Sequence, residues 1–160
     1  MTRTREHVYH IAPAYSIGHD INDDCHYIII SSGSRYDMLS GNKNVCVLHF
    51  ADTEIGTRPD AFSTRDIKTI ISFIDTCDNS DVFISCDEGQ SRSPAIVAGL
   101  LRCSGQNDDY IWKSKEYRPN VYVYSLLLQS CCSGEDIEEE LGMLKKLSAE
   151  DYRTYRKTAE

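Results

Sequence analysis

The sequence lacks the features that would place the protein on a nucleic acid or in a membrane. Its 17 basic residues are outnumbered by 25 acidic ones, giving a net charge of −8, which argues against binding to nucleic-acid phosphates or an anionic membrane surface. No apolar run is long enough to span a bilayer, and the N-terminus has no apolar core of a signal peptide. We therefore expect a cytoplasmic protein with neither a nucleic-acid nor a membrane partner.

The spacings that usually mark a metal site are also missing. The chain contains no Cys-x-x-Cys pair and no paired histidine ligands of the kind that zinc sites use, so no zinc site is predicted. An odd number of cysteines, seven, lies mostly in apolar surroundings, which is typical of free thiols in a reducing compartment. We expect free cysteines, no metal and no cofactor.

Length and periodicity predict one α/β domain covering residues 1–160, large enough to form a core without cross-links. Strand-like runs occur at residues 7–11, 27–30, 45–50 and 82–84, and residues 35–43 form a loop or short helix. Helical patterns follow a Ser63–Asp66 capping box and recur at 95–101, 110–116, from Asn120, around Ile137 to Leu144, and from Ser148. This order predicts three layers, with a central, mostly parallel sheet flanked by helices. The strand–helix–strand unit from residue 45 to 84 implies a right-handed crossover between parallel neighbours.

The most informative stretch is residues 81–101, in which a buried strand, a polar loop and a buried helix follow one another. The loop runs from Cys86 to Arg92, and Ser93-Pro94 is a helix-start signal with Ser93 as the capping residue. Unpaired backbone N–H groups at a helix start favour an anion. Gly89 permits the tight turn that brings successive amides together. The loop is therefore predicted to be an oxyanion cradle.

Two side chains of this loop suit it to bind a phosphate group and to react with it. Arg92 offers a planar fork that matches two phosphate oxygens. Cys86 at the strand end would lie beneath the anion, where the amides and the guanidinium favour its thiolate form. A thiolate below a phosphorus atom is aimed for in-line attack.

The pattern Cys86, Gly89, Arg92, Ser93 resembles the signature loop of the cysteine-dependent protein tyrosine phosphatases, and most closely the dual-specificity branch. The family usually has His before the cysteine, where this chain has Ser85. A Pro-Asn pair before a later helix, ending at Asn120, is also similar, and the resemblance covers about residues 45–130. It implies a phosphatase-like fold and a metal-free phosphatase acting on a phosphorylated protein or a small phosphomonoester.

The resemblance also implies the roles of individual residues. The catalytic residues would be Cys86 as nucleophile, Arg92, Ser93 as a hydroxyl donor to the sulfur, and an Asp general acid roughly thirty to forty residues before the cysteine. Asp52, directly after the strand at 45–50, fits this position, with Glu54 and Asp60 as alternatives on the same loop. The phosphate would be bound by the loop itself: Asp87, Glu88, Gly89, Gln90, Ser91 and Arg92.

Two acidic residues in the loop leave other functions open. Asp87 and Glu88 oppose phosphate binding unless their side chains point to water and only their amides face inward, and they argue against a phosphoinositide phosphatase. One alternative is therefore a catalytically weak or silent phosphate-binding pseudophosphatase, and another is a rhodanese-type sulfur transferase. Low-molecular-weight phosphatases and arsenate reductases use the same spacing, but near the N-terminus.

Overall fold

The centre of the molecule is a four-stranded sheet in which every strand pair is parallel. The computed structural model describes residues 7–17, 21–77 and 81–159. The predicted strands are all present, in the spatial order β1-β4-β2-β3: β1 (Tyr9–Pro13), β2 (His26–Ser31), β3 (Val45–His49) and β4 (Val82–Cys86). The N-terminal segment 1–6, for which the sequence predicts no signal peptide, lies outside the described residues. The predicted α/β class with a central parallel sheet is confirmed.

Helices follow the sequence patterns, with boundaries close to those predicted. The Ser63–Asp66 capping box is present, since the backbone N–H of Ser63 donates to Asp66 Oδ2 at 3.0 Å. A short helix directly after β1 was not predicted, and the 35–43 segment contains a single 3₁₀ turn. The helices are α1 (Ala14–Ile17), η1 (Asp37–Leu39), α2 (Thr64–Thr76), α3 (Arg92–Cys103), α4 (Asp109–Lys113), α5 (Val121–Cys131), α6 (Glu135–Lys146) and α7 (Ala149–Thr158).

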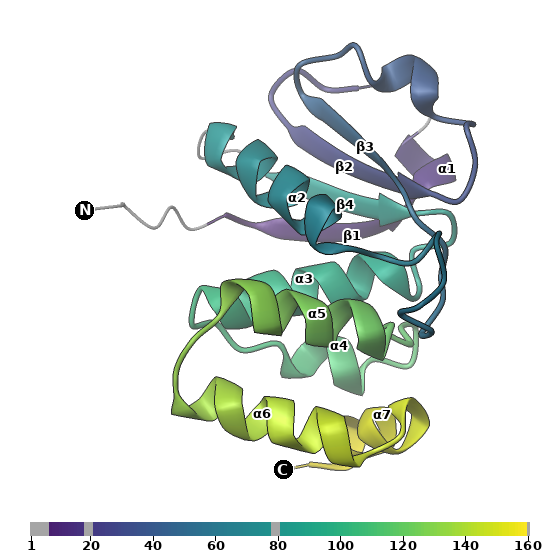
Figure 1. Cartoon of the computed structure of the whole chain (residues 1–160). Helices are drawn as coiled ribbons and strands as arrows, with labels where there is room; N and C mark the ends of the chain where they lie inside the picture. Colours follow the sequence, from purple (N-terminus) through teal and green to yellow (C-terminus); the bar gives the residue numbers. More distant parts are fainter. Residues whose placement is uncertain (1–6, 18–20, 78–80, 160) are drawn as a thin grey trace.

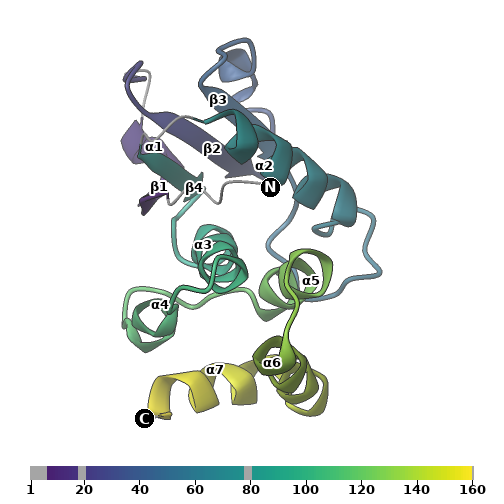
Figure 2. The ribbon, with the colours of Figure 1, turned by 90° about the vertical axis from the view of Figure 1, so that its left-hand side faces the viewer.

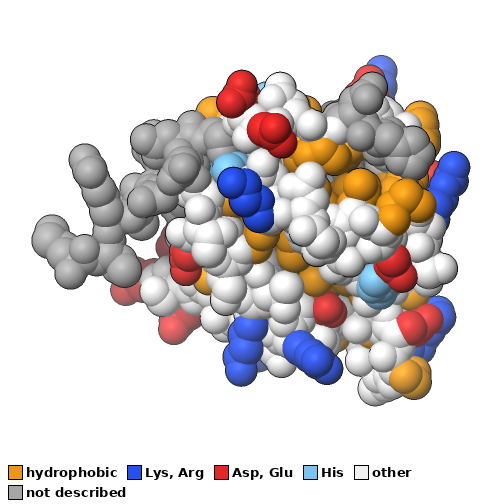
Figure 3. Space-filling model, turned by 90° about the horizontal axis from the view of Figure 1, so that it is seen from above, with side chains coloured by type: hydrophobic (Ala, Val, Ile, Leu, Met, Phe, Trp, Pro, Cys, Tyr) orange, Lys and Arg blue, Asp and Glu red, His pale blue; other side chains and the backbone are white. Residues whose placement is uncertain are grey.

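The two faces of the sheet are covered to very different extents. On one face, Ile28, Ile30 and Ile84 pack in a large core with residues of α2, α3 and α5, beyond which α4, α6 and α7 form a further layer (Figures 1 and 2). On the other face, Tyr27 and Ile29 belong to a small core covered by α1 and η1. Viewed from that side, hydrophobic side chains are visible between polar ones (Figure 3). Because β2 is buried on both faces, its continuous apolar run is explained.

The crossover from β3 through α2 to β4 is parallel as predicted, but the prediction that it joins neighbouring strands is wrong. β2 lies between β3 and β4, and β4 pairs with both β1 and β2. Strand β4 is therefore interior, and Cys86 at its end pairs with Pro13 of β1 and Ile30 of β2. An interior position at the carboxyl edge of a parallel sheet is where open α/β folds bind ligands.

The cysteines correct a second prediction. Cys103 and Cys132 form a disulfide with a Cα–Cα distance of 4.8 Å, whereas the sequence predicted only free thiols. The bond joins the last residue of α3 to the residue after α5, and these helices pack so closely that a Cβ on Gly99 would lie 2.6 Å from Leu127 Cδ2. The other five cysteines are not part of a disulfide. Within the described ranges, no helix has the length and hydrophobicity required to cross a bilayer.

Candidate functional site

A tight loop connects the end of β4 to the start of α3. Gly89 has φ +69°, and a Cβ at this position would lie 2.7 Å from the backbone nitrogen of Pro13. A side chain is therefore excluded for two reasons, the left-handed backbone and the contact with β1. The loop is pressed against β1 and stabilised from the other side by Arg118 N–H, which donates to the Gln90 carbonyl at 2.7 Å.

Helix α3 begins two residues earlier than the sequence indicated. Its N-cap is Ser91, and Ser93 lies in the first turn, so the prediction that Ser93 caps the helix is wrong. Pro94 is tolerated there because the first four N–H groups of a helix have no intrahelical partner. The change frees the Ser93 hydroxyl for another contact.

That contact is the sulfur of Cys86. Ser93 Oγ lies 3.2 Å from Cys86 Sγ, and the Ser93 backbone N–H donates to the same sulfur at 3.4 Å. Cys86 is only 2% exposed, but it lines the pocket described below. The sulfur thus contacts both the hydroxyl and the backbone N–H of Ser93 in the first turn of α3.

The Arg92 side chain is buried, and both of its terminal nitrogens donate hydrogen bonds to other residues. Its Nη1 donates to Ser32 Oγ at 3.0 Å and to the Phe50 carbonyl at 2.9 Å, and its Nη2 donates to Asp87 Oδ2 at 3.0 Å. Its Nε is buried and has no hydrogen-bond partner among the described residues. Nε–H and one Nη2–H of a guanidinium point the same way and form the fork that holds an oxyanion.

Asp87 and Glu88 behave differently from one another. The Asp87 carboxylate is turned toward Arg92, and its other oxygen accepts from Ser31 Oγ at 3.1 Å. Asp87 therefore does not meet the condition that both carboxylates point to water, because the guanidinium attracts it. Glu88 is exposed and lines the pocket.

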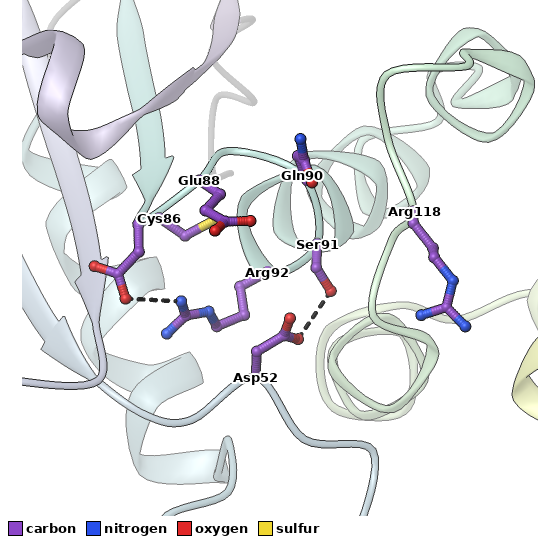
Figure 4. A pocket seen from close by; sticks show the side chains of 8 residues that line it. Asp52, Cys86, Glu88, Gln90, Ser91, Arg92 and Arg118 are labelled. Carbon is purple, nitrogen blue, oxygen red and sulfur yellow. Dashed lines mark hydrogen bonds and ion pairs between the residues drawn. The ribbon is translucent and has the colours of Figure 1, made fainter.

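These side chains surround one open pocket of about 410 Å³ at the carboxyl edge of the sheet (Figure 4). Cys86 and Arg92 lie at its inner side, and Asp52 approaches from the loop after β3. All the predicted loop residues line it except Gly89. The lining residues are Asp52, Cys86, Asp87, Glu88, Gln90, Ser91, Arg92 and Arg118.

Asp52 is fixed by two hydrogen bonds to the same oxygen. Ser91 Oγ and Asn120 Nδ2 each donate to Asp52 Oδ1 at 2.8 Å. Asn120 is 1% exposed, and its own Oδ1 caps α5 by accepting from the Val123 N–H at 3.0 Å. Both hydrogen bonds to the carboxylate end on Oδ1, which leaves Oδ2 for other chemistry.

The two alternative acids are engaged elsewhere. Glu54 accepts from Arg153 Nη1 at 3.0 and 3.2 Å and from the Val121 N–H at 3.1 Å. Asp60 pairs with Arg58 at 2.7 Å. Neither lines the pocket. Of the three candidates, the structure brings only Asp52 to Cys86.

Several residues at the site could not have been named from the sequence. Ser32 and the Phe50 carbonyl bind Arg92, and Asn120 binds Asp52, in each case across a large sequence separation. The only prior signal was that Asn120 follows Pro119 before a helix and that Ser32 follows a strand. Neither signal specifies a partner.

Two further observations complete the site. Ser85, which stands where the phosphatase family usually has His, is fully buried, and its hydroxyl has no hydrogen-bond partner in the described part of the chain. In residues 7–17, 21–77 and 81–159, no group of three or more His, Cys, Asp or Glu side chains could hold a metal ion.

Comparisons of this chain with protein-family models, with curated proteins and with solved structures found no match. The site must therefore be interpreted from its own geometry.

Proposed function

We propose that this protein is a phosphoric monoester hydrolase of the protein tyrosine or dual-specificity type, acting through a cysteinyl-phosphate intermediate. One observation carries the proposal. The buried Arg92 Nε has no partner in the described residues, although it belongs to a guanidinium in the same pocket as the Cys86 sulfur. A buried charged donor without a partner is costly, and an oxyanion above the sulfur would satisfy it.

The first chemical step transfers the phosphoryl group to the protein. The Cys86 thiolate attacks phosphorus, an Sγ–P bond forms, and the bond from phosphorus to the ester oxygen breaks. Asp52 gives a proton to the departing oxygen, and Oδ2 is the atom for this task because Oδ1 accepts from Ser91 and Asn120. Arg92 and the loop amides stabilise the equatorial oxygens.

The second step releases phosphate. A water molecule gives a proton to Asp52 and attacks phosphorus, and the Sγ–P bond breaks to return the thiolate. The Ser93 hydroxyl, 3.2 Å from Sγ, donates to the sulfur as its negative charge returns. The Ser93 backbone N–H supports the same charge. No step requires a metal, since protein groups supply the positive charge.

Hydrolysis of p-nitrophenyl phosphate in the presence of EDTA tests the proposal. We expect turnover that vanadate blocks, loss of activity in Cys86→Ser, and strong loss in Arg92→Lys, because a point charge cannot replace the fork. Cys25→Ser is the matched control, since Cys25 is a free, partly buried thiol just before the opposite end of β2. Full activity in Cys86→Ser would refute the mechanism.

The Asp87–Arg92 ion pair favours one second candidate, a phosphate-binding protein without turnover. Asp87 Oδ2 lies 3.0 Å from Nη2 and competes with an incoming oxyanion for that nitrogen. Phosphate or vanadate binding by calorimetry without any hydrolysis would support this alternative. Transfer of sulfur from thiosulfate to cyanide would instead identify a sulfur transferase.

A cytoplasmic location and a phosphorylated protein or small phosphomonoester as substrate belong to the same proposal. Disulfides are rare in a reducing cytoplasm. Blocking thiols in intact cells before isolation tests the location: a fully formed Cys103–Cys132 bond would count against it.

A further inference from the structure

The charged side chains that line the pocket differ in whether the protein neutralises them. Asp87 pairs with Arg92 at 3.0 Å. Arg118 on the opposite side pairs with Glu150 of α7 at 2.6 Å. Glu88 forms no hydrogen bond or ion pair with any residue in the described ranges, and it is exposed. Asp52 accepts only from the neutral Ser91 and Asn120, and in the proposed first step it holds the proton that it gives to the departing oxygen. Glu88 is therefore the acidic group of the pocket lining whose charge no cation among the described residues balances.

The backbone that carries Glu88 is held in place. The next residue, Gly89, is pressed against Pro13 of β1, and the preceding residue, Asp87, is bound by both Arg92 and Ser31. Figure 4 shows the Glu88 side chain turned from the loop toward the pocket. The loop therefore fixes the position from which the Glu88 side chain extends into the lining of the pocket.

We propose that the site selects phosphomonoesters that carry a positively charged group next to the phosphate, with Glu88 as the specificity-determining residue. This inference rests on the proposed function. A cation beside the phosphate gains an attractive interaction with Glu88, whereas an acidic neighbour is repelled by the same group. Arg118, which would favour acidic neighbours, forms an ion pair with Glu150, a carboxylate that also pairs with Arg153.

The test compares kcat/KM for matched substrates. One arm uses phosphotyrosine peptides that differ only in Arg or Glu at the two flanking positions. The other uses 4-(aminomethyl)phenyl phosphate against phenyl phosphate. We expect about a two- to fivefold preference for the cationic member, the scale of exposed charge pairs, and a smaller preference as salt rises from about 0.05 M to about 0.5 M. A preference in the peptide arm alone indicates a basic phosphopeptide, and one in both arms indicates that charge suffices.

Variants assign the preference to a residue. Glu88→Gln should abolish it, while Glu138→Gln, the same charge change at an exposed position of α6, should leave it intact. Equal values for the paired substrates, or a preference that survives Glu88→Gln, would overturn the inference while p-nitrophenyl phosphate turnover still supports the proposed function. If no ester is hydrolysed, the proposed function fails, and calorimetric binding of the paired peptides to the wild-type chain and Glu88→Gln decides the inference by the same criteria.

Discussion

Replacing Asn120 tests whether the position of Asp52 matters to catalysis. The Asn120 amide does two jobs: Nδ2 donates to Asp52 Oδ1 at 2.8 Å and to the Thr53 carbonyl at 3.1 Å, while Oδ1 caps α5 through the Val123 N–H. Serine keeps a capping oxygen and loses both donors, whereas alanine loses everything. Asn120→Ser thus separates the catalytic contribution of the side chain from its contribution to the helix.

The size of the expected fall in kcat follows from the strength of the hydrogen bond to Asp52 that Asn120→Ser removes. A bond to a charged acceptor contributes about 1.5–3 kcal/mol, so if that restraint acts in the transition state, kcat falls by about ten- to a hundredfold. This is below the full contribution of a general acid, about 10² to 10⁴. Asn120→Ala should lose a similar factor and also about 1 kcal/mol of unfolding free energy with the cap.

The assay compares two leaving groups. Phenyl phosphate needs a proton on the departing oxygen, so the full loss in kcat should appear there. p-Nitrophenyl phosphate releases a weakly basic phenolate, and its kcat should change by less than about threefold, since protonation contributes little. Ser91→Ala removes the second donor to Asp52 and no capping hydrogen bond, because the Ser91 side chain makes none to the first turn of α3; it should show the same pattern more weakly. An equal loss for both esters in Asn120→Ser would refute the positioning role.

Three further predictions concern the fold. Gly89→Ala should lower the unfolding free energy by about 1–3 kcal/mol, because residue 89 has a positive φ and contacts β1. Gly41→Ala is the control, since a Cβ there meets nothing within 4 Å. Equal urea midpoints for the two variants would contradict the loop geometry. Without reductant, five of the seven cysteines should react with a thiol reagent in denaturant, and seven reactive thiols would disprove the Cys103–Cys132 bond. The bond joins residues at a sequence separation of 29, so reducing it should lower the unfolding free energy by about 3–4 kcal/mol in a calorimetric scan. Burial raises the pKa of the Cys46 thiol from 9.0 to about 11. The contribution of this thiol to stability is therefore complete below pH 9 and is lost as the pH rises toward 11. Cys46→Ala should make the decline in urea midpoint over that range shallower, and an unchanged decline would contradict the raised pKa of Cys46.

The part of the fold that could be predicted is the part specified by local patterns. Ile67, Ile70 and Ile74 recur at helical spacing and form the buried side of α2, and the apolar run of β2 marks an interior strand. The order of the strands in the sheet could not be predicted from such local patterns, because it depends on which strand inserts between two others. The run of residues from β3 to β4 carries no information that β2 lies between them.

The residues of the candidate site likewise include some that the sequence could identify and others that only the packing of the fold brings together. Asp52 could be named because a residue directly after a parallel strand reaches the same sheet edge as Cys86. Asn120 could not, since its hydrogen bond to Asp52 depends on how α5 packs beside α3. The Cys103–Cys132 bond has the same origin, because only the packing of those helices brings the two thiols together.

Rapid-quench mass spectrometry during p-nitrophenyl phosphate turnover tests the central claim most directly. Acid quenching within the first turnover, followed by proteolysis, should place a phosphoryl group on the peptide that contains Cys86, and the modification should be absent in Cys86→Ser and after vanadate treatment. A phosphoryl group on another residue, or turnover without any modified Cys86 peptide, would contradict the proposed role of this sulfur.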